Sequence, residues 1–462
     1  MSERRYFGTD GIRGRVNQAP MTVENAVQLG RAVALTFSRP GHRAKVLVGK
    51  DTRLSGYMLE AALMAGITST GADVILLGPV PTPGIAFLTT SMRADAGIVL
   101  SASHNPFYDN GLKVFGHDGF KLPDEIEIKL EALMDQPSDS MPLADDSAIG
   151  RAKRVDDAGG RYVTHLKTML RKEFDLSGIR VVVDCANGAA HRIAPTLFSE
   201  LGAEVSPLGV TPNGTNINEQ CGSLFPEFVS QKVRETGAHI GVALDGDADR
   251  VILVDEKGQV INGDAVLGMC ALEMKSRGQL RHDTVVATVM SNMGLDRMLT
   301  NAGMRLERTA VGDRYVVQRM REGGFNFGGE QSGHLVFLDH ATTGDGLVAA
   351  LQVLNLMLSR QQPLSEIATV FEPFPQVLLS QQINDRPPLE TLPNVQRCIQ
   401  DAEEKLTGRG RVLVRYSGTE YKVRVMVEGE DPQLTQTLCE SILDAFGTDV
   451  GFPTQPKDSA DV

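Results

Sequence analysis

The sequence predicts an α/β protein made of three related α/β domains and a smaller α+β domain at its C-terminus. The 462 residues are too many for one hydrophobic core and correspond to three or four domains of ordinary size. One pattern of strand, loop, helix and second strand occurs three times along the chain. The residues after 374 follow a different pattern, which indicates a separate domain.

The three copies of the repeat each begin with an uninterrupted Val-rich segment. These segments are AKVLVGKD at 44–51, IRVVVDCANG at 179–188 and DTVVATVMSNMG at 283–294. A continuous apolar run bounded by turn residues is typical of a strand that is covered on both faces. We therefore expect each copy to contribute buried strands to an α/β sheet.

A further apolar strand follows each copy and runs directly into a polar loop. AGIVL at 96–100 enters SASHNP, HIGVAL at 239–244 enters DGDADR, and FNF at 325–327 enters GGEQSGH. Ligands of α/β sheets bind beyond the carboxyl ends of the strands. Three dissimilar polar loops at equivalent strand ends therefore predict one cleft built by three domains. The alternative is three unrelated polar turns.

Polar and Pro-containing stretches mark the domain boundaries. We predict domains at 1–155, 156–256, 257–373 and 374–448, followed by a disordered tail at 449–462. In the last domain, PNVQRCIQDAEEKL predicts a helix, and GRVLVRY and YKVRVMVEG predict the two strands of a hairpin.

Composition and charge restrict the partners of the chain. The formal net charge of −12, with no basic arm to offset it, argues against non-specific nucleic-acid binding. The N-terminus has no apolar signal segment, and the best apolar helix candidate is about half as long as a membrane span. The five cysteines lie far apart, which indicates neither a zinc site nor a disulfide framework. We expect a cytoplasmic protein with no membrane partner.

Asp245, Asp247 and Asp249 alternate directly after a predicted strand. Alternation lets the three carboxylates face one point, where their mutual repulsion requires a cation. A ligand set made only of oxygen favours Mg²⁺ over zinc. An EF-hand is one alternative, but Arg250 stands where that loop needs Gly. A solvated acidic turn is the other.

Ser103 lies beside His104 in the first polar loop. Neighbouring side chains of an extended chain point to opposite faces, so we predict that these two do not share a hydrogen bond. A Ser–His dyad is therefore not favoured, and the G-x-S-x-G elbow of hydrolases is absent. A phosphoryl group on Ser103 would instead complete the shell of the predicted Mg²⁺. Ser103 is thus a candidate phosphoryl carrier, with an ordinary polar loop as the alternative.

The tip of the predicted C-terminal hairpin has the sequence RYSGTE. Arg415 offers a bidentate fork, and Ser417 and Thr419 offer hydroxyl groups. Gly418 frees backbone amides, and Arg424 on the next strand would add a second fork, so the tip suits a phosphate. A tight turn with a solvated arginine is the alternative. No Walker A or dinucleotide motif is present, so nucleotide binding is not indicated.

Three further candidates rest on weaker patterns. Glu330, Ser332 and His334 alternate in the third loop and suit sugar hydroxyls, although a polar turn and a core-edge histidine are equally consistent. Arg13 lies within the Gly-rich segment FGTDGIRG, which is either a phosphate loop or a simple turn. Lys113 follows Ser103 by ten residues and is either a cation that returns to the serine or an exposed lysine.

Six motifs, taken in order, resemble the α-D-phosphohexomutase superfamily over nearly the whole chain: FGTDGIRG, SASHNPFYDNGLK, DGDADR, VGDRYV, GGEQSGH and RYSGTE. The resemblance implies four domains in a heart-shaped arrangement around one central cleft. It implies that Ser103 is an active-site phosphoserine and shares one Mg²⁺ per active site with Asp245, Asp247 and Asp249. It gives catalytic roles to Arg13 and Lys113, and we add His334 of the third loop as a further catalytic candidate. The substrate-binding residues it implies are Glu330, Ser332, Arg415, Ser417, Gly418 and Thr419. We add Arg250 and Arg424 as further substrate-binding candidates.

The resemblance also implies a reaction on a small hexosamine phosphate. Glucosamine 6-phosphate and glucosamine 1-phosphate would interconvert through a 1,6-bisphosphate, which also serves as activator, to supply UDP-N-acetylglucosamine and hence peptidoglycan. A homodimer is left open.

Two alternatives to this interpretation remain. A phosphomannomutase/phosphoglucomutase of the same superfamily is disfavoured because GEQSGH stands where GEMSGH is associated with that branch. A non-catalytic sugar-phosphate sensor is disfavoured because a sensor needs neither Ser103 nor three intact carboxylates.

Overall fold

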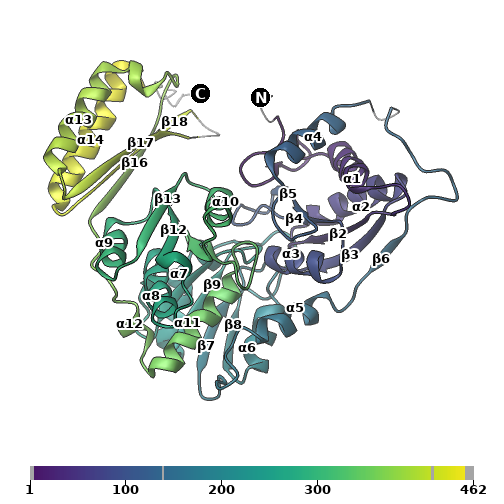
Figure 1. Ribbon diagram of the computed structural model, residues 1–462, viewed down its shortest axis with the longest axis horizontal. Helices are drawn as coiled ribbons and strands as arrows, with labels where there is room; N and C mark the ends of the chain where they lie inside the picture. Colours follow the sequence, from purple (N-terminus) through teal and green to yellow (C-terminus); the bar gives the residue numbers. More distant parts are fainter. Residues whose placement is uncertain (1–4, 138–139, 418–420, 453–462) are drawn as a thin grey trace, which may run out of the picture. The chain divides into compact units, whose positions relative to one another are not determined.

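The computed structural model describes residues 5–137, 140–417 and 421–452 and divides into two compact units. Unit 1 comprises Met1–Ser291 and Ala302–Val370, and unit 2 comprises Asn292–Asn301 and Phe371–Val462. The described residues form four sheets with helices packed on them (Figure 1). The predicted α/β class is therefore confirmed, and the boundaries of four separate domains stay a prediction.

The first sheet of unit 1 has six strands, in the order β1 (Ile12–Arg15), β5 (Asp109–Gly116), β4 (Ala96–Leu100), β2 (Lys45–Lys50), β3 (Asp73–Pro79) and β6 (Ala152–Arg154). Its helices are α1 (Val23–Phe37), α2 (Ser55–Ser69), α3 (Thr82–Ser91) and α4 (Asp124–Met134).

The second sheet has five strands, in the order β11 (Val260–Ile261), β10 (Val251–Asp255), β9 (Ile240–Leu244), β7 (Arg180–Asp184) and β8 (Glu204–Leu208). The helices that accompany it in the chain are α5 (Ala158–Lys167), α6 (Ile193–Glu200) and α7 (Pro226–Thr236).

The third sheet has four strands, in the order β13 (Arg305–Thr309), β12 (Thr284–Thr288), β14 (Phe327–Gly329) and β15 (Leu335–Phe337). The helices of this part of unit 1 are α8 (Gly263–Ser276), α10 (Asp313–Gly323), α11 (Gly346–Arg360) and α12 (Leu364–Ile367).

The three sheets share one strand order, as the internal repeat predicts. The equivalent strands are β5-β4-β2-β3, β10-β9-β7-β8 and β15-β14-β12-β13. In each set the first pair is antiparallel and the other two pairs are parallel. The three polar loops therefore leave equivalent strands at their carboxyl ends, where α/β sheets bind ligands.

The strand β2 shows why an uninterrupted apolar run predicts this architecture. Val46 and Val48 point to one face and join a core with residues of α1 and α2. Gly49 points to the other face, where a Cβ atom would lie 2.5 Å from the side chain of Ile85 in α3. Both faces of the strand are thus covered, and alternation of polar with apolar residues would bury polar groups.

Unit 2 contains the fourth sheet and the C-terminal helices. Its antiparallel strands lie in the order β16 (Gln376–Gln382), β18 (Lys422–Gly429) and β17 (Gly410–Tyr416). The helices α13 (Pro393–Leu406) and α14 (Pro432–Asp449) pack along this sheet (Figure 1). The helix α9 (Met293–Asn301), which lies between β12 and β13 in the chain, belongs to this unit. The predicted helix and hairpin are both present.

The predicted tail begins too early. Asp449 is the last residue of α14 and does not start a disordered segment. Its carboxylate accepts hydrogen bonds from the backbone N–H groups of Asn394 and Val395, both at 3.0 Å, and so caps α13. Residues 453–462 of the predicted tail lie outside the described residues.

Within the described residues, no helix combines the length and the apolar character that crossing a membrane requires. All five cysteines are free thiols.

Candidate active site

Ser103 lies in the loop between β4 and β5 and is 1% exposed. Its hydroxyl donates a hydrogen bond to Asp245 Oδ2 at 2.5 Å, across 142 residues of sequence. The loop after the first sheet therefore meets the loop after the second, as the repeat predicts.

The prediction that Ser103 and His104 do not share a hydrogen bond is wrong. Ser103 Oγ lies 3.3 Å from His104 Nδ1. The reason is that Ser103 has a φ of 53°, so the chain is not extended there and neighbouring side chains do not alternate. Burial, with the charges of Arg250 and Arg13, lowers the pKa of His104 to about 4, so the ring is neutral at pH 7.

Asp245, Asp247 and Asp249 form a buried cluster in the loop between β9 and β10. One carboxylate oxygen of each lies within 4.8 Å of the others. Burial and the charges of Asp249 and Asp247 raise the pKa of Asp245 well above its ordinary value. Among the described residues, no group donates a hydrogen bond to Asp247 Oδ1 or Asp249 Oδ1, although both atoms are buried. Three converging carboxylates with unused oxygens fit a Mg²⁺ ion.

Thr82 of the first repeat binds Asp247 of this cluster. Thr82, the first residue of α3, donates its hydroxyl to Asp247 Oδ2 at 2.6 Å, and its backbone N–H donates to the Asp247 carbonyl at 3.0 Å. The position of Asp247 thus depends on a helix that lies 165 residues away in the chain.

The predicted basic residues Lys113 and Arg13 lie beside the carboxylates. Lys113, on β5, is 1% exposed, and its ammonium lies 2.9 Å from Asp247 and 3.3 Å from Asp249. Its third partner is Asp10, at 3.2 Å, which also pairs with Arg13. Lys113 is therefore not an exposed lysine, and it contacts the carboxylate cluster.

The third loop brings His334 to the same place. The side chain of His334 is 2% exposed, with Nδ1 3.7 Å from Asp249 and Nε2 3.4 Å from Asp313. The Gly344 N–H donates to Nε2 at 3.1 Å, which favours the neutral ring, whereas Asp313 and Asp249 favour the charged ring. Burial opposes the charge, but the two aspartates raise the pKa of His334 above its ordinary value.

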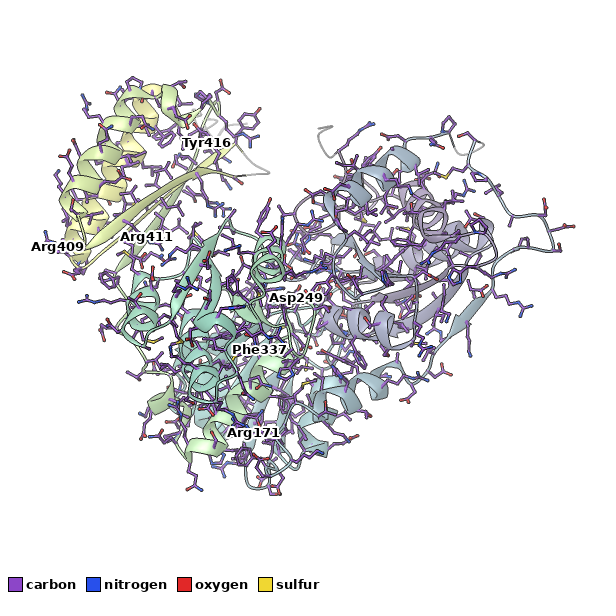
Figure 2. All side chains as sticks on the ribbon, viewed as in Figure 1. Arg171, Asp249, Phe337, Arg409, Arg411 and Tyr416 are labelled. Atoms are coloured by element: carbon purple, nitrogen blue, oxygen red, sulfur yellow. The ribbon has the colours of Figure 1, made fainter. Side chains whose placement is uncertain are left out.

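Glu330, Ser332 and Arg250 differ in their exposure. Glu330 is 8% exposed and accepts a hydrogen bond from the Gly312 N–H at 3.1 Å. Ser332 is exposed at the tip of the turn. The Arg250 side chain is 25% exposed and lies 3.9 Å from Asp249, while its backbone N–H donates to Asp245 at 3.1 Å. Figure 2 labels Asp249, the residue that His334, Lys113 and Arg250 share as a partner.

Ion pairs in this region close into a ring that joins all three repeats. Lys121 lies 2.5 Å from both Asp10 and Asp313, and the pairs already described complete the circuit. We call this set the charge ring, and its members, in order, are Asp10, Lys121, Asp313, His334, Asp249 and Lys113.

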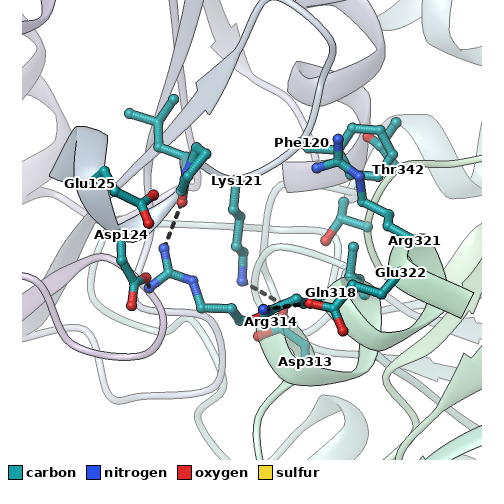
Figure 3. Close-up of a pocket in the computed structure, with 14 residues that line it drawn as sticks. Phe120, Lys121, Asp124, Glu125, Asp313, Arg314, Gln318, Arg321, Glu322 and Thr342 are labelled. Atoms are coloured by element: carbon teal, nitrogen blue, oxygen red, sulfur yellow. Dashed lines mark hydrogen bonds and ion pairs between the residues drawn. The ribbon is translucent and has the colours of Figure 1, made fainter.

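One side of the charge ring forms the wall of a cavity of about 340 Å³ between α4 and α10. Lys121 reaches across this cavity to Asp313 (Figure 3). Beside them, Arg314 donates to the Leu122 carbonyl at 2.7 Å and pairs with Glu127. Lys121 and Asp313 were not predicted as site residues. Asp313 lies within the motif VGDRYV, but no local pattern indicates that it meets Lys121.

The hairpin of unit 2 carries two arginines directly opposite each other. Arg415 on β17 pairs in register with Arg424 on β18. Like charges directly opposite in a sheet are destabilising. Burial and Arg424 lower the pKa of Arg415. Within the described part of the chain, neither guanidinium forms an ion pair with a carboxylate, so the pair is suited to an anion.

Ser417 follows β17 and is 5% exposed. Its carbonyl accepts a hydrogen bond from Arg386 at 2.8 Å, and sequence inspection missed Arg386 because it lies 31 residues upstream. Figure 2 labels Arg411, the second residue of β17, and Tyr416, its last. Gly418 and Thr419 lie outside the described residues.

Four family models match the chain in succession. The descriptions are phosphoglucomutase/phosphomannomutase alpha/beta/alpha domain I at residues 4–141, domain II at 160–258, domain III at 262–374 and the C-terminal domain at 375–445. The chain belongs to the phosphoglucomutase/phosphomannomutase family. The predicted superfamily is thereby confirmed.

Phosphoglucosamine mutases of several organisms match the chain over nearly its whole length. It is 58% identical over 430 residues to a phosphoglucosamine mutase of Citrifermentans bemidjiense, covering 93% of this chain and 94% of the relative. It is 54% identical over 458 residues to a phosphoglucosamine mutase of Syntrophotalea carbinolica, covering 98% and 100%.

Solved structures of family members share the fold. A phosphoglucomutase/phosphomannomutase family protein from Burkholderia thailandensis matches with a TM-score of 0.80 and 25% identity, covering 98% of this chain and 100% of that one. An N-acetylphosphoglucosamine mutase of Aspergillus fumigatus, solved with GlcNAc-6P and magnesium, matches with a TM-score of 0.64 and 17% identity, covering 96% of each.

Proposed function

We propose that this chain is a phosphoglucosamine mutase that interconverts glucosamine 6-phosphate and glucosamine 1-phosphate through a phosphoserine at Ser103. One observation carries the proposal: the Ser103 hydroxyl lies 2.5 Å from Asp245, within a buried cluster of three carboxylates. A phosphoryl carrier needs a cation beside it, and this cluster provides a place for one. A sugar-phosphate sensor would need neither the hydroxyl nor the cluster.

The reaction consists of two phosphoryl transfers. In the first, O1 of glucosamine 6-phosphate attacks the phosphorus on Ser103, the P–Oγ bond breaks, and the sugar becomes the 1,6-bisphosphate. The proton of the sugar hydroxyl ends on Ser103 Oγ. In the second, Ser103 Oγ attacks the 6-phosphate, the bond between phosphorus and O6 breaks, and O6 receives the proton. We assign these proton movements and the stabilisation of charge to Arg13, Lys113 and His334.

Asp245, Asp247 and Asp249 would hold the Mg²⁺, with Ser103 as a further ligand through its phosphoryl group. When bound, the ion supplies positive charge that stabilises the transferring phosphoryl group. Lys113 adds a second positive charge, since its ammonium lies within 3.3 Å of two of the aspartates.

The residues that bind substrate divide into two groups. Glu330, Ser332 and Arg250 would contact the sugar. Arg415, Ser417 and Arg424, with Gly418 and Thr419, would hold the phosphate that does not react. Since the bisphosphate must turn over between the two transfers, this phosphate cradle has to accept either phosphate. Added glucosamine 1,6-bisphosphate, or a similar hexose bisphosphate, would phosphorylate Ser103 and act as activator.

The preference for glucosamine over glucose or mannose rests on the relatives. Bacterial proteins named phosphoglucosamine mutase are 54–58% identical to this chain over more than nine-tenths of its length. Gln331 in GEQSGH also departs from the GEMSGH associated with the other branch. We propose that this chain acts in the cytoplasm on a small hexosamine phosphate. A homodimer stays a prediction that analytical ultracentrifugation would test.

Turnover of glucosamine 6-phosphate, glucose 1-phosphate and mannose 1-phosphate by the purified protein tests the substrate. We expect the highest kcat/KM for glucosamine 6-phosphate, and a higher value for either of the others would overturn the assignment.

Ser103→Ala tests the carrier. We expect it to remove nearly all activity with the fold intact, because no other hydroxyl of this loop contacts the cluster. The peptide that contains Ser103 should carry an adduct of about 80 Da, the mass of one phosphoryl group, in active wild-type protein. Full turnover by the variant would exclude Ser103 as the carrier.

A further inference from the structure

The Ser103 loop is held from inside the protein by one buried guanidinium, that of Arg53. This residue lies between β2 and α2, and its side chain is 0% exposed. Each of its five N–H groups donates a hydrogen bond. Nε donates to Asp51 Oδ2 at 2.8 Å. The other four donate to main-chain carbonyls of the loop, those of Ser103 at 3.0 Å, Asn105 at 2.8 Å, Asp109 at 3.1 Å and Pro106.

Asp51, the carboxylate partner of Arg53, is connected through Ser101 to the backbone N–H of Ser103. Asp51 Oδ2 accepts the hydroxyl proton of Ser101 at 2.7 Å. The Ser101 hydroxyl oxygen in turn accepts the backbone N–H of Ser103 at 2.9 Å. Both backbone polar groups of Ser103 are therefore bound by buried side chains of one connected network.

This network acts on a residue with an uncommon backbone conformation. Ser103 has a φ of 53°, in the left-handed region that non-glycine residues seldom adopt. Such a conformation persists only where surrounding bonds determine it, and it is common at functional sites. Here it directs Ser103 Oγ to Asp245. Asn218, from the second repeat, donates to the Ser103 and Asn105 carbonyls at 2.9 and 3.1 Å and adds to the restraint.

We propose that Arg53, with Asp51 and Ser101, is a positioning group that sets Ser103 for phosphoryl transfer. The inference rests on the proposed carrier role of Ser103 and assigns Arg53 no contact with substrate. Phosphoryl transfer needs the entering and leaving oxygens in line, so a small displacement of Oγ costs much of the rate. Substrate binding involves other loops and should change little.

Arg53→Lys is the direct test, because lysine keeps the charge but offers three donors and no planar fork. We expect kcat to fall about 100-fold, with KM within about threefold of wild type. Arg180→Lys is the matched control. Arg180 also donates two hydrogen bonds to one carbonyl, that of Gly237, at 3.0 and 2.6 Å. Because Arg180 is exposed and lies on β7, the kcat of the Arg180→Lys variant should equal that of wild type.

Ser101→Ala is a second variant that tests the positioning role if Arg53→Lys does not fold. It removes one acceptor from the Ser103 N–H and leaves the guanidinium in place, so we expect kcat to fall about tenfold at constant KM. Circular dichroism and the melting temperature establish the folded fraction at the assay temperature, and rates are expressed per folded molecule. If the fall in kcat disappears when rates are expressed per folded molecule, the network only stabilises the fold and the positioning role is wrong.

Ser103→Ala, assayed in parallel, separates this inference from the proposed function. If Ser103→Ala is inactive while Arg53→Lys and Ser101→Ala keep wild-type kcat, the positioning role is wrong and the carrier role stands. If Ser103→Ala is fully active, the carrier role is wrong. A raised KM with unchanged kcat in Arg53→Lys would place the residue in substrate binding and overturn the positioning role.

Discussion

Asp247 uses only one of its two carboxylate oxygens for hydrogen bonds within the described chain. Oδ2 accepts from Thr82 at 2.6 Å and from Lys113 at 2.9 Å, while Oδ1 is buried and accepts none. A buried acceptor without a donor lowers stability by roughly 1–3 kcal/mol. A cation at Oδ1 offsets that cost, so this single oxygen is the feature that most directly indicates a metal.

Asp247→Asn should therefore weaken Mg²⁺ binding and lower kcat by about two decades or more, since the ion acts on charge that develops in transfer. KM for glucosamine 6-phosphate should change little. Calorimetric titration of Mg²⁺ and steady-state kinetics measure the two effects. Asp255→Asn is the control, since Asp255 is also buried in this sheet but binds backbone N–H groups. Unchanged Mg²⁺ affinity in Asp247→Asn would remove Asp247 from the metal site.

At the scale of elements, the start of α11 depends on one buried carboxyl group. Asp345 caps this helix by accepting the N–H groups of Leu347 and Val348 at 3.0 Å, and the Tyr162 hydroxyl donates to its other oxygen at 2.5 Å. Burial, with a contribution from Asp249, raises the pKa of Asp345 to about 6, although these hydrogen bonds oppose the shift. Folding therefore makes Asp345 hold its proton to a higher pH than in the unfolded chain, and the carboxyl ionises near pH 6.

Protonated Asp345 contributes to the free energy of unfolding. This contribution is complete below about pH 4, the ordinary pKa of the group, and is lost as the pH rises to about 6. Asp345→Asn keeps a cap acceptor and removes the charge. We expect the stability of the variant relative to wild type to increase by about 3 kcal/mol between pH 4 and 7 and then to level off. Melting temperatures of both proteins across this range measure the difference. A difference that does not depend on pH would contradict the assigned pKa.

The β17–β18 hairpin places two arginines opposite each other, and an anion would relieve their repulsion. Arg415→Lys keeps the charge but loses the bidentate fork, so it should not behave as a conservative change. One charge-assisted hydrogen bond contributes roughly 1.5–3 kcal/mol, which predicts a loss of about one to two decades in kcat/KM. The loss should be similar for the 1-phosphate and the 6-phosphate, because the proposed cradle would have to hold either phosphate.

Measurement of kcat/KM for Arg415→Lys in both directions of the reaction tests this prediction. Arg397→Lys, on the exposed face of α13, is the control. A defect confined to one direction would refute the shared cradle. No defect at all would show that Arg415 is a solvated residue of β17 with no part in phosphate binding.

At the scale of the molecule, the charge ring joins all three repeats of unit 1. Lys121 and Asp313, which contact each other at 2.5 Å, have side chains 15% and 12% exposed. Removal of one partner from a buried pair leaves an uncompensated charge and costs about 3–5 kcal/mol, whereas removal of both costs less. The pair should therefore be strongly coupled, unlike a pair in solvent.

A double-mutant cycle of Lys121→Met and Asp313→Asn measures this coupling. We expect the two single changes to lower the melting temperature and kcat, and the double change to cost less than their sum, with a coupling of about 0.5–3 kcal/mol. The exposed pair Lys167–Glu200, at 2.6 Å, is the control, and its coupling should not exceed about 1 kcal/mol. Additive losses for Lys121 and Asp313 would show that the ring does not act as a unit.

Features that depend on neighbouring residues could be predicted from the amino-acid sequence alone. Buried parallel strands need continuous apolar runs, so the three repeats, and the loops after β4, β9 and β14, were predictable. The alternation of Asp245, Asp247 and Asp249 similarly predicted a cation site, because three carboxylates close in sequence must also be close in space. The backbone at Ser103 was not predictable, since a left-handed serine is rare and depends on bonds from elsewhere.

Contacts between residues far apart in the chain became known only from the folded structure. Lys121 and Asp313 are 192 residues apart, and Arg53 lies 50 residues from the carbonyl of Ser103 that it binds. An isolated lysine or arginine is usually solvated, and no local pattern distinguishes one that the topology will bury. Once three sheets bring their loops together, burial makes each unpaired charge costly, and the partners are selected by position in space.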